Sequence, residues 1–455
     1  MKRNLPIKIS LLALLISTVI FQYGCSKSAA VNNPPAVTTN TVLSDVTTTT
    51  ATAGGLVSDI GSTGLSAVGI CYSATNQTPT TADTNLPATT IAVGFSLNIT
   101  GLTAGSTYYV RAYATNSGGT SYGAVVKFTT PTTASVTVAT ASTFAGNGTA
   151  GLVNGGGANA QFYNPQGIVA DAQGNFYVSD QFNHVIRKIT SAGVVSTFCG
   201  NGVLGHVDGP AATASFYSPN GLAIDAGGNI YVADEGNNLI VKITPAGVAT
   251  TIAGTGVAAY VNSTNPLTAA FNAPKAVALD SQGNIYVTDS GNNRIRQISS
   301  AGVVITYAGG GAGFADGVGT AALFSNPAAI AVDSKGNIYV GDINNHAIRK
   351  ITTGVTVTTI AGNRVATTQV GNPLAFTVDA SDNLFIADGT GRVLRLLNST
   401  NILNTLAGTS SVSGYADGVG NAAQFNQPAG VTVSGGNIFV SDYGNNRIRK
   451  IVVTN

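Results

Sequence analysis

The sequence has few of the residues on which catalytic chemistry depends. Its 455 residues include no tryptophan, three histidines, three cysteines and a single glutamate, Glu235, and only 9% are charged. So little charge excludes a coiled coil or a typical disordered chain, whereas 56 glycines beside 44% hydrophobic residues are typical of a β-rich fold with many tight turns. Two of the cysteines, Cys71 and Cys199, fall in different parts of the chain, so no disulfide framework is expected.

The N-terminus has the features of an export signal. Basic residues precede the apolar run 9–21, which is too short to span a bilayer comfortably. The pair Gly24–Cys25 resembles a bacterial lipobox, although Gln22 stands where that motif has an aliphatic residue. The resemblance implies a lipoprotein signal peptide 1–24, a lipid on Cys25 and a place in the bacterial cell envelope, as an outer-membrane lipoprotein facing the periplasm or the outside. An ordinary secretory signal with a chance cysteine is the alternative.

Without that signal, the chain would be nearly neutral. Removing the three basic residues of the signal leaves 18 basic against 19 acidic residues. Because nucleic-acid binding needs a basic surface, we expect no nucleic-acid partner. Residues 25–40 are small, polar and proline-bearing, which predicts a flexible tether held to the membrane by its lipid.

Residues 41–131 predict a separate β-domain. The runs 66–75 and 106–123 alternate apolar and polar residues with the period of a strand. Within this region, ITGLTAGSTYYVRAYATN (99–116) resembles the E–F corner and F strand of the fibronectin type III family, with Tyr108 or Tyr109 as the corner tyrosine. The resemblance implies an immunoglobulin-like β-sandwich, which most often serves as a spacer.

From residue 134 onward, one sequence frame recurs six times. It reads PNGLAIDAGGNIYVAD in its second copy, and the copies start at Pro165, Pro219, Pro274, Pro327, Pro373 and Pro428, 46 to 55 residues apart. Two further strand-like runs complete each copy, and four strands at this period are typical of a propeller blade. The frame resembles the NHL repeat family. The last copy lacks a fourth strand, and the run 134–146 predicts that strand, which would close the ring.

The fold expected from the whole sequence is therefore all-β. A six-bladed NHL-type β-propeller over 134–455, closed by the strand 134–146, would follow a fibronectin type III-like sandwich over 41–131. Phenylalanines three residues before the blade prolines are expected to anchor the loops between blades. The fifth blade lacks this phenylalanine, and the short stretch 362–372 before it predicts a notch in the rim.

The aspartates of the propeller recur at fixed places in the repeat. Those that end the second strand are Asp180, Asp234, Asp289, Asp342, Asp388 and Asp442. A carboxylate at a strand end accepts hydrogen bonds from the turn that follows, and active sites break repeat symmetry, so we expect a structural role. The recurring arginines of the third strands are expected to pair with neighbouring aspartates or to cover strand surface. No residue is predicted to be catalytic.

Metal ligands are scarce in this sequence. His184 and His346 occupy equivalent positions in opposite blades, too far apart for one zinc ion, which needs ligands at about 2 Å. Propellers of this kind include zinc-dependent lyases and calcium-dependent lactonases, so the resemblance leaves open a metal-dependent lyase or lactonase at the central channel. A calcium site would need Asp, Asn and Glu235 as ligands. No cofactor is predicted, and calcium is the metal left open.

Ligand specificity should come from positions that differ between blades. Such positions lie directly after the second strand and in the loops between blades, which share one face: Gln181, Glu235 and Tyr443 in the first set, Tyr260, Phe314 and Tyr415 in the second. Aromatic residues with few charges suit a protein, peptide or glycan better than a phosphate. Our first hypothesis is an envelope lipoprotein whose non-catalytic propeller binds such a ligand on its interblade-loop face; the oligomeric state stays open.

Overall fold

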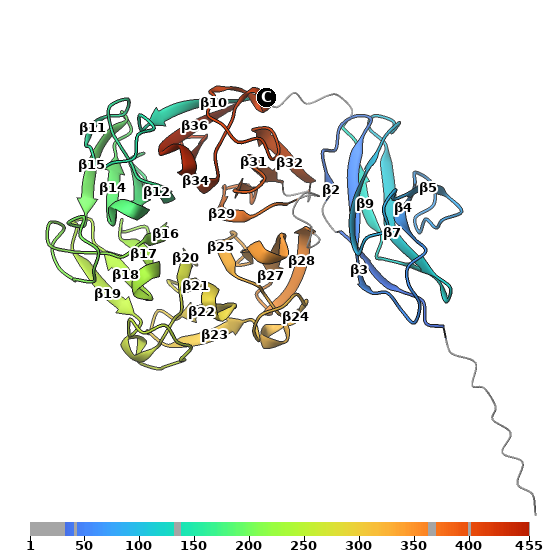
Figure 1. The fold of residues 1–455 in the computed structure, drawn as a ribbon, viewed down its shortest axis with the longest axis horizontal. Coiled ribbons are helices and arrows are strands. Elements are labelled where there is room, and N and C mark those ends of the chain that lie inside the picture. Colours follow the sequence, from blue (N-terminus) through green and yellow to red (C-terminus); the bar gives the residue numbers. More distant parts are fainter. Residues whose placement is uncertain (1–31, 41–42, 132–137, 363–369, 399–401, 455) are drawn as a thin grey trace, which may run out of the picture.

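The computed structural model describes residues 32–40, 43–131, 138–362, 370–398 and 402–454. Within these ranges the chain is all-β, and its helices are single 3₁₀ turns of three residues. None of these described helices is long and apolar enough to cross a membrane. The signal 1–24 and Cys25 lie outside the described residues. The strands form a pair of N-terminal sheets beside a ring of sheets (Figure 1).

Two sheets make up the N-terminal part. The strands of the first are β1 (Ala36–Thr39), β2 (Leu43–Ser44), β3 (Ala51–Asp59) and β6 (Gly94–Ile99); those of the second are β4 (Ala67–Ser73), β5 (Thr84–Pro87), β7 (Thr107–Asn116), β8 (Gly119–Tyr122) and β9 (Val126–Thr129). Alternate residues of β7, among them Tyr108 and Val110, are buried in the core between the sheets. The Tyr108 hydroxyl accepts a hydrogen bond from the Thr103 amide at 2.9 Å, which fixes the turn before β7.

Six antiparallel sheets of four strands surround a common centre in the described residues (Figure 1). We number them one to six in the order of their innermost strands. From the inside outward they are: β12 (Pro165–Ala170), β13 (Phe176–Asp180), β14 (Val185–Ile189), β15 (Val194–Cys199); β16 (Pro219–Ile224), β17 (Ile230–Asp234), β18 (Leu239–Ile243), β19 (Ala249–Ala253); β20 (Pro274–Leu279), β21 (Ile285–Asp289), β22 (Arg294–Ile298), β23 (Val304–Ala308); β25 (Pro327–Val332), β26 (Ile338–Asp342), β27 (Ala347–Ile351), β28 (Thr356–Gly362); β29 (Pro373–Val378), β30 (Leu384–Asp388), β31 (Val393–Leu397), β32 (Ile402–Ala407); β34 (Pro428–Ser434), β35 (Asn437–Asp442), β36 (Arg447–Thr454), β10 (Val138–Ala145).

The outer strand of sheet six, β10, comes from the start of the repeat region, whereas its other three strands come from the end of that region. β10 runs antiparallel to β36, with Ala141 opposite Ile451. Strands from both ends of the repeat region therefore belong to one sheet, and this pairing joins the ring. Short strands of loop residues add a fifth member to several sheets, for example β11 (Gly155–Gly156), β24 (Gly317–Val318) and β33 (Gly418–Val419).

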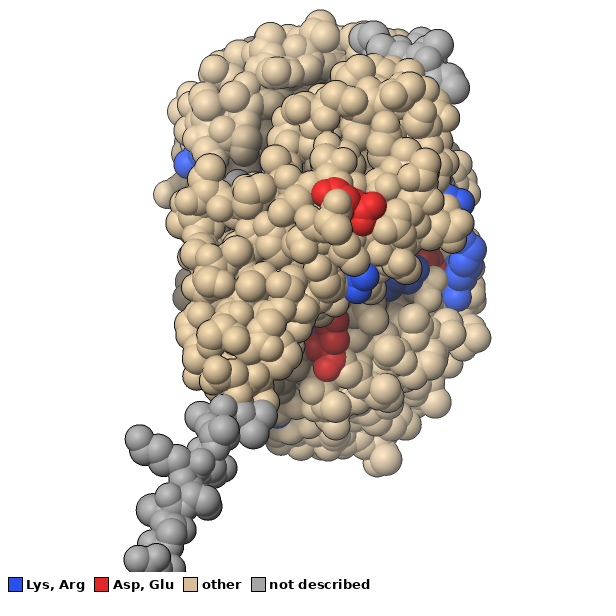
Figure 2. Space-filling view, turned by 90° about the vertical axis from the view of Figure 1, so that its right-hand side faces the viewer, with Lys and Arg blue, Asp and Glu red and all other residues tan. Residues whose placement is uncertain are grey.

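Apolar cores fill the space between neighbouring sheets. The loop phenylalanines lie within them and are 0–1% exposed: Phe162, Phe216, Phe271, Phe324 and Phe425. This burial confirms that they anchor the loops, because a side chain removed from solvent offers no surface to a ligand. Charge is sparse on the outside, and the side of the molecule in Figure 2 is mostly covered by uncharged residues.

Each second strand ends in a fully buried aspartate. The Asp289 carboxylate accepts hydrogen bonds from the Asn272 amide (2.8 Å), the Asn292 side chain (2.9 Å) and the Arg296 guanidinium (2.7 Å). Ion pairs of the same kind are Asp180–Arg187, Asp342–Arg349, Asp388–Arg395 and Asp442–Arg449. These pairs confirm that the third-strand arginines bind neighbouring aspartates.

The donors to these aspartates confirm the expectation in part. The following turn supplies the Asn292 side chain in sheet three and the Gly391 amide in sheet five, but the backbone donor in sheet three comes from Asn272, which precedes the first strand. The reason is the antiparallel register, which places Pro274 opposite Asp289, so the incoming loop passes beside the end of the second strand. Each aspartate that has an arginine partner therefore ties a loop, a turn and a third strand together. The aspartates that end the first strands close their own turns instead, as Asp280 does with the amides of Gln282 and Asn284.

Sheet two departs from this pattern. Val241 occupies the place that Arg296 has in sheet three, since each lies opposite the central valine of its second strand. Asp234 accepts hydrogen bonds from the Tyr217 amide (2.9 Å) and the Asn237 side chain (2.6 Å), and within the described residues it forms no ion pair. It is 0% exposed, and burial raises the pKa of Asp234 to about 7.

Candidate ligand-binding site

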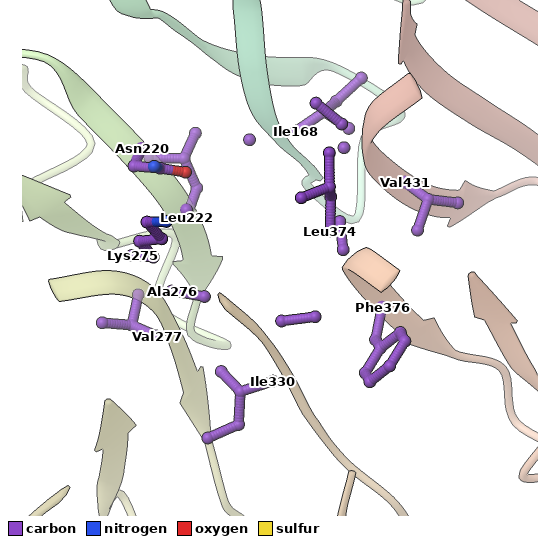
Figure 3. Close-up of a pocket in the computed structure, with 16 residues that line it drawn as sticks. Ile168, Asn220, Leu222, Lys275, Ala276, Val277, Ile330, Leu374, Phe376 and Val431 are labelled. Atoms are coloured by element: carbon purple, nitrogen blue, oxygen red, sulfur yellow. The ribbon is translucent and has the colours of Figure 1, made fainter. Parts of the chain in front are cut away.

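The innermost strands line a narrow channel at the centre of the ring. One part of it is a cavity of about 40 Å³ lined by residues of all six sheets (Figure 3), and a wider hollow of about 230 Å³ follows along the later residues of the same strands. Its side chains are mainly apolar, as shown by Ile168, Leu222, Val277, Ile330, Phe376 and Val431. Small residues let the strands approach so closely: a Cβ on Gly430 would lie 2.1 Å from the Gln166 carbonyl oxygen. The narrow cavity holds a few water molecules, so a larger ligand would have to bind at an end of the channel.

One end of this channel carries the positions that follow the second strands. Glu235 is half-buried, and its carboxylate accepts a hydrogen bond from the Asn220 side chain at 2.7 Å. Burial raises the pKa of Tyr443, and the charges of Glu235 and Tyr163 add to that effect. The Asn164 side chain donates a hydrogen bond to the Tyr443 carbonyl at 3.2 Å, so the loop before sheet one meets the turn after the second strand of sheet six. Glu235 lies at the channel through Asn220, which lines it.

The remaining members of this ring contribute less surface. Gln181 is only 8% exposed, and Ile343 is buried against its neighbours. The Ser290 hydroxyl donates a hydrogen bond to the carbonyl of Pro327 in the next sheet. Gln181 therefore offers little surface to a ligand. The polar side chains at this end of the channel include Asn220 and Lys275, which line it, together with Glu235 and Tyr443.

Three exposed aromatic residues lie on the same face, beside the ends of the second strands of sheets one and two. Tyr163, Phe182 and Tyr217 are 42%, 45% and 40% exposed. The rings of Tyr163 and Phe182 meet edge to face with centroids 5.2 Å apart. Tyr217 lies directly on Gly236, where a Cβ would come within 2.5 Å of the ring, so only glycine allows this placement.

The sequence contained a signal for these aromatics. The residue after each loop phenylalanine is Tyr163, Tyr217, Asn272, Ser325 and Asn426 in turn. This position also varies between repeats, although less than the one after the second strand, and the same argument from broken symmetry applies to it. Sheets one and two place an aromatic side chain where sheets three, four and six have a small polar one.

The other three predicted ligand residues lie elsewhere. The Tyr260 hydroxyl shares a hydrogen bond of 2.7 Å with the Thr306 hydroxyl on the outermost strand of sheet three. The Arg294 guanidinium stacks on the ring of Tyr260, 4.1 Å from its centroid. Tyr415 contacts Thr143 of β10 (2.8 Å) in the same way, under Arg447. Phe314 lines a cleft of about 450 Å³ between sheet four and the N-terminal sheets. The structure thus places Gln181, Glu235 and Tyr443 at equivalent strand ends on one face, and it leaves Tyr260, Phe314 and Tyr415 at the outer rim.

The histidines act as turn residues and loop contacts. His184 adopts φ 56°, and its Nδ1 accepts a hydrogen bond from the Ser218 amide at 3.2 Å, as the side chain of Asn293 does with Asn326. His346 lies 3.0 Å from the Gly371 carbonyl, and His206 contacts the Thr251 hydroxyl at 2.7 Å. Across the described ranges, no three His, Cys, Asp or Glu side chains lie close enough together to hold one metal ion.

Comparison with known proteins places this architecture among NHL repeats. The sequence profile described as NHL repeat matches residues 216–243, 271–298, 324–351 and 425–451. These segments cover the first three strands of sheets two, three, four and six, so the chain contains NHL repeats.

Curated relatives share part of the chain. Protein SUPPRESSOR OF QUENCHING 1, chloroplastic, of Arabidopsis thaliana is 28% identical over 325 residues, which are 67% of this chain and 26% of the plant protein. Bovine NHL repeat-containing protein 2 is 27% identical over 249 residues, 47% of this chain and 34% of the relative. The chain thus matches about a quarter to a third of the length of these relatives.

Solved bacterial structures share the fold over nearly the whole chain. A Bacteroides thetaiotaomicron protein of unknown function has a TM-score of 0.55 at 19% identity and covers 93% of this chain and 99% of its own. An auxiliary nutrient binding protein from Bacteroides ovatus has a TM-score of 0.52 at 16% identity, with the same coverage. At such identities the likeness concerns the fold, and it includes the N-terminal sheets.

Proposed function

We propose that this chain is a bacterial envelope lipoprotein that binds a glycan at the mouth of its central channel. In this proposal a lipid on Cys25 and a tether hold a fibronectin type III-like sandwich and a six-bladed NHL propeller (134–455), and the propeller is not catalytic. The tether is shorter than the predicted 25–40, because Ala36–Thr39 pairs with β3 as the first strand of the sandwich, which therefore begins before residue 41. The six sheets around one centre and the β10–β36 pairing support the propeller. The bond from the Thr103 amide to Tyr108 supports the sandwich, because a corner tyrosine bonds to backbone a few residues upstream.

The ligand site is inferred from the place where the side chains stop repeating from sheet to sheet. The face of sheets six, one and two that carries Glu235 and Tyr443 also carries three exposed aromatic residues, Tyr163, Phe182 and Tyr217, each beside the end of a second strand. Aromatic rings offer large apolar faces with a polar edge, and a few placed polar groups fix a ligand's orientation. A sugar has matching apolar faces and hydroxyl groups, and it needs no strong charge from the protein. The Bacteroides nutrient-binding proteins of similar fold support ligand binding as the role.

A glycan array, followed by calorimetry with the glycan that binds, tests the proposal. We expect Tyr217→Ala and Glu235→Gln each to weaken binding by about 10-fold or more, the loss typical of a central contact residue. Tyr217 donates to Asp234 through its backbone amide, so the alanine variant keeps that bond. The matched control is Tyr260→Ala, which removes an equally exposed tyrosine at the rim.

Two outcomes would contradict this site. Equal losses in Tyr217→Ala and Tyr260→Ala would remove the channel mouth as the ligand site. Binding to a peptide array with no glycan bound would replace the ligand class by a peptide. Metal analysis of the same protein, with thermal unfolding in EDTA, tests the lyase or lactonase alternative: bound calcium or zinc that stabilises the protein would favour it.

A further inference from the structure

The outer edges of five sheets are covered by their own loops. In each, one or two residues of the loop before the sheet pair antiparallel with the outermost strand, and the first of these pairs are Gly155 with Val195, Gly209 with Ala249, Ser263 with Val304, Gly317 with Val357 and Gly418 with Ala141. Such pairing matters because an uncovered edge presents unpaired N–H and C=O groups to other chains. The first covering residue is glycine or serine, and asparagine or aspartate precedes it every time.

Sheet five has a different covering strand. The sequence between Gly362 and Pro373 contains no Asn or Asp followed by Gly or Ser. Instead, β2 of the N-terminal sheets runs parallel to β32, with Leu43 opposite Ile402 and Ser44 opposite Leu403. The Asp45 amide completes the contact with a hydrogen bond of 3.1 Å to the Leu403 carbonyl.

Ser44 takes the place that the loop residue has in the other sheets. Leu403 pairs with Leu397, the last residue of its third strand, as Val304 pairs with Ile298 in sheet three. Leu403 and Val304 are therefore equivalent, and so are their covering residues, Ser44 and Ser263. The predicted notch at 362–372 falls mostly outside the described residues, but the edge beside it is covered by the N-terminal segment.

We propose that the outer edge of sheet five is the docking surface for this chain's own segment Leu43–Asp45. The sandwich held in this way is a fixed part of the ring, in contrast to the spacer that its family resemblance implies. The segment couples two cores directly: Leu43 is 2% exposed inside the sandwich, and Leu403, beside it on the sheet, is 0% exposed in the core between sheets four and five. This proposal does not depend on the ligand or on the lipid.

Hydrogen exchange on the full chain tests the docking. Ile70→Ala removes buried volume from the sandwich core, where Ile70 is 0% exposed, far along the chain from sheet five. We expect this variant to speed amide exchange in the sandwich and in β32 (Ile402–Ala407). Exchange in β23 (Val304–Ala308) should stay unchanged, because the loop residue Ser263 covers that edge. A second variant, Ser44→Pro, alters the covering segment itself and should loosen β32 in the same selective way.

Two results would overturn the proposal. One is faster exchange throughout the sandwich while β32 keeps its full protection, which would mean that sheet five does not need the segment. The other is an equal loss in β32 and β23, which would mean a general loss of stability without a specific role at this edge.

Discussion

Replacing Val241 by arginine would test whether the buried aspartates depend on their ion pairs. Arg296 in sheet three donates to Asp289, to the carbonyls of Ala270 and Val261 and to the side chain of Asn262. Sheet two offers the equivalent acceptors without the arginine: Asp234, the carbonyls of Ser215 and Val207, and Asp208. In Val241→Arg the guanidinium would meet a complete set of acceptors. It would also lie over the buried ring of Phe216, as Arg296 lies over the ring of Phe271 in sheet three.

The size of the effect follows from the pKa of Asp234. Burial raises it to about 7, against about 3.9 in an unfolded chain, and each pKa unit corresponds to about 1.4 kcal/mol. The folded protein thus holds a proton that the unfolded chain has released, so Asp234 lowers stability progressively as the pH rises from about 4 to about 7. The full loss of unfolding free energy at pH 8 would be about 4 kcal/mol, which is an upper bound. We expect the arginine to restore about 2 kcal/mol of this, because burying its own charge also costs free energy.

Urea unfolding at pH 5 and pH 8 provides the assay. We expect Val241→Arg to be more stable than the natural chain at pH 8 and to gain clearly less at pH 5, where Asp234 is mostly protonated. The reverse change in sheet three, Arg296→Val, should destabilise by about 3–5 kcal/mol, since it leaves Asp289 buried without a partner. A pH-independent effect of Val241→Arg, or no loss in Arg296→Val, would refute the reasoning.

Two further predictions concern packing and thiol chemistry. Gly430→Ala should lower stability by about 1–3 kcal/mol in urea unfolding, because its Cβ would lie 2.1 Å from the Gln166 carbonyl oxygen and the inner strands must move apart; Gly156→Ala, whose Cβ would meet nothing within 4 Å, is the matched control and should change little. Burial raises the pKa of Cys71 to about 11 and that of Cys199 to about 12, so neither thiol should react with maleimide at pH 7 until the protein is unfolded; rapid labelling of the folded chain at either position, measured by mass spectrometry, would contradict their burial.

Much of the fold was predictable because it repeats. The frame that starts at Pro219 and its copies predicted NHL repeats, and the matching sequence profile confirms four of the six copies, those that start at Pro219, Pro274, Pro327 and Pro428. Period and turn chemistry are local properties, so they are readable in a sequence without knowledge of distant contacts. Glu235 was selected for the same reason, as a residue that varies where its neighbours recur.

The candidate site was only partly predictable. The sequence pattern does not single out Tyr163 and Tyr217, although their position also varies, because each directly follows a phenylalanine that the pattern assigns to the core. Tyr260 and Tyr415 were grouped with Glu235 because loops that share a face look equivalent in sequence. The structure separates these tyrosines from Glu235. The four strands of one sheet extend from the centre of the ring to its outer rim, so one loop also extends from the outer rim to the channel mouth.

The sequence alone determined the all-β class, the repeated strands, the buried phenylalanines and the aspartates that pair with arginine. These follow from patterns that recur every 46 to 55 residues, and each copy confirms the others. Only the tertiary structure decided which exposed residues meet at the channel mouth, and that Ser44 covers the edge of sheet five. Both depend on contacts between segments far apart in the chain, made largely through backbone hydrogen bonds, and backbone pairing leaves little trace in the identity of the residues that form it.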